Sequence, residues 1–108
     1  MNNQLLPIGS VVLLKGGTKE LMINGYLPVD KNTGEIYEYS ACLFPEGLLL
    51  VDEIALIKAD AIEKVLFKGY TTAASENVLK KLTRINNMVK ENPNISKEQI
   101  ETLMTESE

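Results

Sequence analysis

Short apolar runs separated by turn residues dominate the chain up to about Tyr70. The apolar run at residues 10–15 is followed by Gly16-Gly17, and a second run starts at residues 20–23. Two glycines between β-type runs supply the backbone conformations of a tight turn, so a β-hairpin is predicted here. A third strand is predicted at residues 35–43, which mix aromatic and β-branched residues and end at Phe44-Pro45-Glu46-Gly47.

Residues 48–70 carry two competing patterns. Residues 63–68 alternate as in a half-buried strand, whereas other apolar residues recur at helical spacing: Ile54, Ile57, Ala61, Ile62 and Val65. We favour a strand, a short helical turn around residues 59–61 and a second strand, because the upstream hairpin needs pairing partners and Gly69 fits a strand end. The pattern itself leaves residues 48–61 open between strand and helix.

The sequence after about residue 71 is helical in pattern and has no glycine. Apolar residues at three- and four-residue spacing predict a helix with Ser75 as its N-cap and an end near Asn92-Pro93. The run Ser96-Lys97-Glu98-Gln99 matches a capping box and predicts a second, short helix.

Together these patterns predict an α+β fold in a single domain, residues 1–108. We expect a small curved antiparallel sheet or an SH3-like barrel of about five strands at about residues 8–70, followed by one long and one short helix at about residues 75–106. A chain of 108 residues with 44% hydrophobic content is large enough for one core without disulfides or metals.

The chain is poor in histidine and cysteine, two residues that often carry catalysis or hold metals. It has no histidine, and its one cysteine, Cys42, lies in an apolar stretch and is expected to be a buried thiol. No Cys-x-x-Cys pair or calcium-type loop occurs, and Gly16-Gly17 lacks the spacing of a phosphate-binding loop. We expect no catalytic residue, no metal, no cofactor and no enzymatic activity. Neighbouring carboxylates are interpreted as a solvated face: Glu35 with Glu38, and Asp52 with Glu53.

Charge argues against nucleic acid as the partner. The formal net charge is −4 and the eleven Lys and Arg are scattered, whereas phosphate binding needs clustered cations. The aromatic residues leave one alternative open, a stacking platform on a small barrel built from Tyr26, Tyr37, Tyr39, Tyr70, Phe44 and Phe67. Residues 5–14 are apolar but interrupted, so no targeting segment and no membrane partner are predicted, and the protein is expected in the cytoplasm.

The helices supply the candidate protein-binding surface. The apolar row of the long helix is typical of a face that covers a sheet. The short helix buries little by itself and is expected to complete its packing on another chain. The candidate contact residues are Val78, Leu82, Ile85, Val89, Ile100, Leu103 and Met104. These patterns do not specify an oligomeric state.

Several runs in fixed order resemble the signature of an uncharacterised bacterial family. They are Leu6-Pro7-Ile8-Gly9-Ser10-Val11-Val12-Leu13-Leu14-Lys15-Gly16-Gly17, Lys19-Glu20-Leu21-Met22-Ile23, Tyr37-Glu38-Tyr39, Phe44-Pro45-Glu46-Gly47 and Val65-Leu66-Phe67-Lys68-Gly69-Tyr70. The likeness covers about residues 5–82. The family is a domain of unknown function from Gram-positive bacteria, encoded in type VIIb secretion loci beside LXG-type polymorphic toxins.

The resemblance implies an accessory role in toxin export and supplies no catalytic residue. The implied partner is a protein, either an LXG toxin or its helical targeting factors, for which this chain would act as adaptor or chaperone. Two alternatives stand beside it: an immunity protein that neutralises the toxin, and a small-barrel nucleic-acid-binding protein.

Overall fold

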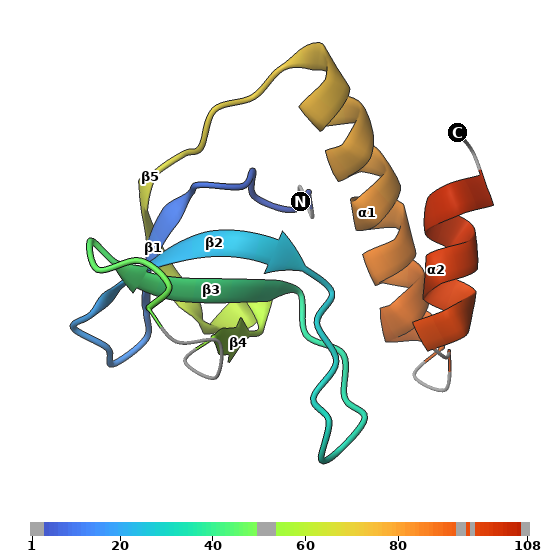
Figure 1. Ribbon diagram of the computed structural model, residues 1–108, viewed down its shortest axis with the longest axis horizontal. Helices are drawn as coiled ribbons and strands as arrows, with labels where there is room; N and C mark the ends of the chain where they lie inside the picture. The colour runs from blue at the N-terminus through green and yellow to red at the C-terminus, as the bar shows by residue number, and fades with distance from the viewer. Residues whose placement is uncertain (1–3, 50–53, 93–94, 96, 107–108) are drawn as a thin grey trace. The chain divides into compact units, whose positions relative to one another are not determined.

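The computed structural model describes residues 4–49, 54–92, 95 and 97–106. Five strands are followed by two α-helices (Figure 1), which confirms the predicted α+β fold. The strands are β1 (Val11–Leu14), β2 (Glu20–Tyr26), β3 (Tyr39–Phe44), β4 (Ala55–Ile57) and β5 (Ile62–Phe67); the helices are α1 (Ala73–Glu91) and α2 (Lys97–Glu106). A single turn of 3-10 helix, η2 (Ala59–Ala61), lies between β4 and β5.

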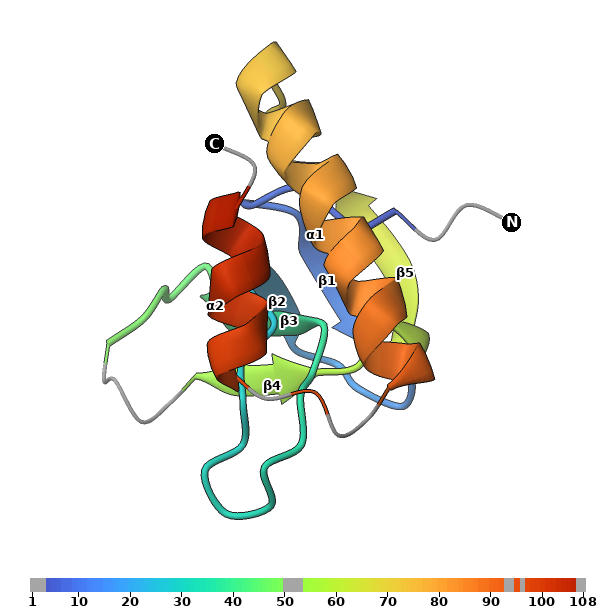
Figure 2. The same ribbon diagram turned by 90° about the vertical axis from the view of Figure 1, so that its right-hand side faces the viewer.

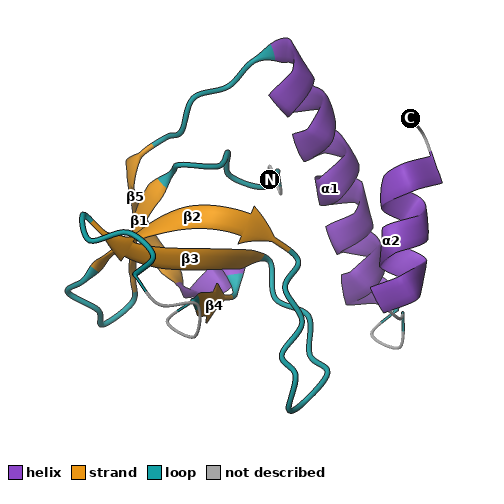
Figure 3. Ribbon diagram, viewed as in Figure 1, coloured by secondary structure: helices purple, strands orange, loops and turns teal. Residues whose placement is uncertain are grey.

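The strands form one curved sheet in the order β4-β3-β2-β1-β5, and every neighbouring pair is antiparallel (Figure 3). β1 and β2 make the predicted hairpin, in which Gly16 takes the left-handed conformation with φ of 75°. β5 follows η2 yet pairs with β1, so the last strand closes against the first. As a result β5 is an edge strand.

The third strand begins later than predicted. β3 starts at Tyr39, while residues 27–38 form a loop with one isolated bridge between Val29 and Ile36. A polar turn closes this loop, because the Asn32 N–H donates to Asp30 Oδ1 at 2.8 Å and the Asp30 N–H donates to the Glu35 carbonyl. Turn chemistry therefore outweighs the β propensity of residues 35–38.

The ambiguous segment resolves as strand, helical turn and strand, with β4, η2 and β5 in that order. The buried carboxylate of Glu38 anchors the turn, since its Oε1 accepts the Ala59 N–H at 2.8 Å. Our interpretation of Glu38 as a solvated residue is therefore wrong. Its neighbour Glu35 is exposed, as expected, whereas Asp52 and Glu53 lie outside the described residues.

The chain divides into two compact units, one formed by Leu6–Thr71 and the other by Met1–Leu5 with Thr72–Glu108. The prediction of a single domain stays a prediction. In the sheet unit the most deeply buried apolar side chains are Val12, Ile23, Ala41 and Ile57, each 2% exposed or less. Cys42 is a buried free thiol, as the apolar stretch around it predicts.

Hydrogen bonds hold the segment before β1 to two other parts of the sheet unit. The Gly69 N–H, just after β5, donates to Ser10 Oγ at 3.0 Å, and both residues are buried. The Gly9 N–H donates to the Ile23 carbonyl, and the Ser10 carbonyl accepts the Ile23 N–H. The segment before β1 is thus held between β2 and Gly69, two residues after the end of β5.

In the helical unit α1 begins one turn earlier than predicted. Its N-cap is Thr72, whose Oγ1 accepts the Ser75 N–H at 3.0 Å while the Thr72 N–H donates to Ser75 Oγ at 2.6 Å. Ser75 is therefore the third helical residue in a reciprocal capping box. α1 ends at Glu91 as expected, and α2 lies beside it (Figures 1 and 2). Pro93 and Ser96 lie outside the described residues.

Two tyrosines form hydrogen bonds with the backbone of Leu6 within the sheet unit. The Tyr26 hydroxyl donates to the Leu6 carbonyl, and the Leu6 N–H donates to the Tyr39 hydroxyl oxygen at 2.9 Å. The centroids of the two tyrosine rings are 6.1 Å apart. Burial, with a smaller contribution from Tyr39, raises the pKa of Tyr26 to about 12 from its ordinary 10.0. Burial likewise raises the pKa of Tyr39.

Alkaline pH is therefore expected to weaken the fold through Tyr26. The unfolded chain loses this phenolic proton near pH 10, and the folded chain keeps it up to about pH 12. The stabilisation is complete below pH 10 and is lost as pH rises towards 12. Denaturant unfolding of the wild type and of Tyr26→Phe at pH 8 and pH 11 measures it. The gap between the two proteins should narrow at pH 11; an equal gap at both pH values contradicts the prediction.

Candidate protein-binding groove

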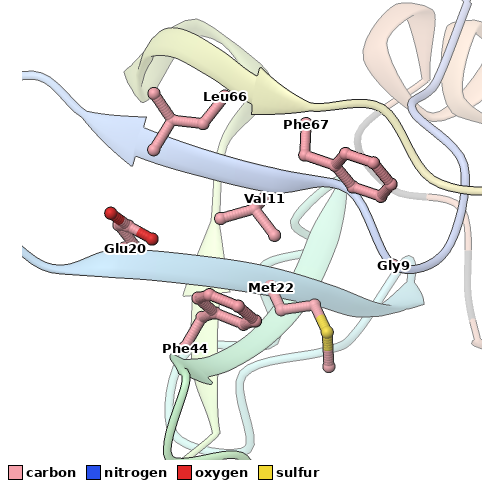
Figure 4. Close-up of a pocket in the computed structure, with 7 residues that line it drawn as sticks. All are labelled: Gly9, Val11, Glu20, Met22, Phe44, Leu66 and Phe67. Carbon is pink, nitrogen blue, oxygen red and sulfur yellow. The ribbon is translucent and has the colours of Figure 1, made fainter.

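An apolar groove crosses four strands on one face of the sheet (Figure 4). It has a volume of about 640 Å³ and is lined by Gly9, Val11, Glu20, Met22, Phe44, Leu66 and Phe67. The strand register explains this gathering, because residues paired across strands share a face. Val11 pairs with Met22 on β2 and with Phe67 on β5, and Glu20 pairs with Phe44 on β3.

A β-bulge in β5 places two consecutive side chains in the groove. Val11 pairs with Phe67 and Val12 pairs with Val65, so Leu66 has no partner on β1. In a regular strand neighbouring side chains point to opposite faces, but an extra residue in a bulge breaks this alternation. Leu66 and Phe67 therefore both line the groove (Figure 4).

The groove exposes large apolar side chains around a buried floor. Val11, in the floor, is 7% exposed, whereas Phe67 is 61%, Leu66 45% and Phe44 44% exposed. Exposed aromatic and aliphatic side chains gathered on one small surface are typical of a site that another molecule covers. The groove can therefore bind an apolar surface of another molecule.

Glu20 is the one ionisable residue in the groove lining. Its side chain is exposed at the start of β2, and no ion pair of Glu20 is found among the residues that the structure describes. An apolar ligand that covers Glu20 must therefore offer a hydrogen-bond donor or a cation, because a carboxylate removed from water without a partner is costly. Glu20 therefore makes the groove favour ligands that carry a positive charge or a hydrogen-bond donor near this carboxylate.

The residues that the sequence pattern nominated for protein binding lie in the helical unit. Leu82, Ile85 and Ile100 are buried, with exposures of 5%, 1% and 7%. Val89 and Leu103 are half-buried, and Val78 is exposed. The side chain of Met104 lies outside the described residues. That a partner contacts this set stays a prediction.

The aromatic residues proposed as one stacking platform occupy separate places. Phe44 and Phe67 line the groove, while Tyr26 and Tyr39 bind Leu6. The Tyr37 ring lies 4.8 Å from Lys58 Nζ, which also pairs with Glu35 Oε2 at 2.8 Å. The hydrogen bond between Lys58 and Glu35 raises the pKa of the Lys58 ammonium group. Tyr70 is 84% exposed.

The described residues hold neither a metal-binding cluster nor a helix that could cross a membrane. No group of three or more His, Cys, Asp or Glu among them is placed to hold a metal ion. Within the same residues no helix has the length and apolar character needed to cross a membrane. The absence of catalysis stays a prediction.

A family model matches the chain, whereas searches of individual proteins find no match. No curated protein and no solved structure matches it. The family model described as "Domain of unknown function (DUF4176)" matches residues 5–78, which include the whole sheet and every residue of the groove. Since this match spans more than half of the chain, the protein belongs to the DUF4176 family.

Proposed function

We propose that this domain is a non-enzymatic, protein-binding accessory factor, an adaptor or chaperone for an LXG-type toxin exported by a type VIIb secretion system. The observation that supports protein binding is the groove, in which Phe67, Leu66 and Phe44 remain exposed beside the buried Val11. The link to toxin export rests on the runs of sequence that resemble proteins of such loci. In this proposal the domain acts in the cytoplasm, before export.

Co-purification from a host that carries the native locus tests the proposal. The tagged wild-type chain should retain the LXG toxin or its helical targeting factors. Phe67→Asp should lose them, because it puts a charge into the apolar surface that the partner covers. Tyr70→Asp is the matched control, since it changes an aromatic residue that is 84% exposed and outside the groove. If the tagged wild-type chain retains no product of the locus, the proposal is contradicted.

Deletion of the gene separates the export role from its alternative. An adaptor or chaperone is needed for export, so its loss should abolish toxin secretion and leave the cells healthy. An immunity protein neutralises the toxin, so its loss should leave secretion intact and poison the producing cell. Secretion and viability measured in the same deletion strain decide between these two outcomes.

A further inference from the structure

We propose that the groove receives an amphipathic helix of the partner, with a Lys or Arg of that helix against Glu20. This inference rests on the proposed function, in that it takes the groove to be a protein-binding site. It adds the secondary structure and the charge of the segment that binds, both of which follow from the lining of the groove.

The span of the groove fits a helix better than an extended segment. Its walls are Leu66 and Phe67 on β5 and Phe44 on β3, which are three strand spacings apart in the order β3-β2-β1-β5. At about 4.8 Å per spacing the walls are about 14 Å apart along the sheet. An α-helix with its side chains is about 10–12 Å across and fills such a space. A single extended strand covers about one spacing and leaves the Val11 floor open.

The lining suits the apolar stripe of a helix. Side chains at three- and four-residue spacing form a continuous apolar face, and such a face docks into hydrophobic grooves. Met22 at the centre is half-buried and unbranched, so it adapts to the shapes of different side chains. The two phenylalanines give large contact areas on opposite walls.

Glu20 selects among amphipathic helices by charge. A helix that covers the groove removes water from this carboxylate, so a Lys or Arg close to the apolar stripe favours binding and an acidic residue there opposes it. The chain's own helices fit poorly. α2 has one basic residue, Lys97, against Glu98 and Glu101. α1 is basic, but its apolar row is already buried at Leu79, Leu82 and Ile85. Charge and burial therefore favour a basic helix of another protein over either helix of a second copy.

Selection of peptides from a random 16-residue display library on the full chain tests the inference. Peptides should be selected that have apolar residues at helical spacing and a Lys or Arg beside that stripe. Synthetic copies should gain helical circular dichroism when they bind. Phe67→Asp should weaken their binding about 30-fold or more, as expected for an interface centre, and Tyr70→Asp should leave binding unchanged.

A charge reversal tests the contact with Glu20. Glu20→Lys should weaken binding of the basic peptides about fivefold or more, and exchanging the peptide's cation for Glu should restore it on this variant. Glu63→Lys is the matched control, because Glu63 is an exposed carboxylate of β5 outside the groove. It should leave both affinities within twofold.

Three results of the peptide selection would overturn the inference: peptides that bind without gaining helix, peptides indifferent to Glu20→Lys, or failure to select any peptide that Phe67→Asp weakens. Concentration-dependent self-association abolished by Phe67→Asp would assign the groove to a second copy and also overturn it. Because the peptides come from a random library, these results do not depend on the toxin locus. Failure to retain a product of that locus would instead count against the proposed function alone.

Discussion

Replacing Gly69 with alanine is expected to destabilise the sheet unit by about 3 kcal/mol, at the upper end of the cost of overpacking. A Cβ atom at this position would lie 2.9 Å from the carbonyl carbon of Ile8 and 3.0 Å from the backbone nitrogen of Ser10, and closer still to the Ile8 carbonyl oxygen. These are backbone atoms, so no side chain can rotate away. The chain before β1 must move, which also strains the hydrogen bond from the Gly69 N–H to Ser10 Oγ.

Thermal and urea unfolding of Gly69→Ala measure this effect, and the midpoint temperature should fall by more than about 10 °C. Gly17→Ala is the matched control. A Cβ at Gly17 meets the Leu14 carbonyl oxygen at 3.4 Å, an ordinary contact, so its free energy of unfolding should change by less than about 1 kcal/mol. Equal stability of Gly69→Ala and the wild type would show that the approach of the two segments is looser than described.

Removing the buried carboxylate of Glu38 is expected to cost about 2 kcal/mol, as for other hydrogen bonds to charged groups. In Glu38→Ala the Ala59 N–H loses the acceptor that lies 2.8 Å away, and η2 loses its anchor on the loop before β3. Because η2 joins β4 to β5, both edges of the sheet should loosen. Hydrogen exchange should therefore accelerate in these two strands more than in β2.

Two variants serve as controls for Glu38→Ala. Glu38→Gln keeps an oxygen acceptor of similar shape and should recover about half of the lost free energy of unfolding. Glu35→Ala removes a carboxylate from the same loop, but one whose ion pair with Lys58 is exposed, so its cost should stay below about 1 kcal/mol. Equal losses for Glu38→Ala and Glu35→Ala would contradict the anchoring role of Glu38.

The sequence predicts the fold well where turns are strong. Gly16 marks the first hairpin, and a short helical turn at residues 59–61 was expected because the upstream strands need partners. The prediction is wrong where a contact distant in sequence decides. Glu38 looks like a solvated residue until β3 is paired with β4, which brings its carboxylate to Ala59. Periodicity has no information about such contacts.

The groove was not predicted, for a related reason. Alternation in residues 63–68 gives each side chain of β5 a face, but the bulge at Leu66 depends on the register against β1. Phe44 and Phe67 come from strands separated by two others, so their proximity is a property of the sheet. Helical spacing in α1, in contrast, identifies a shared face without showing whether a partner covers it. Leu82 and Ile85, which we nominated as contacts, are buried.

The bulge in β5 also bears on aggregation. An exposed edge strand with the sequence Val65-Leu66-Phe67 is a template on which other chains can add strands, since no strand of the described residues pairs with its outer edge. The extra residue at Leu66 disturbs the regular spacing that such addition requires, and Lys64 and Lys68 flank the apolar run as charged gatekeepers. The domain can thus expose apolar side chains in the groove while the β5 edge resists the addition of further strands.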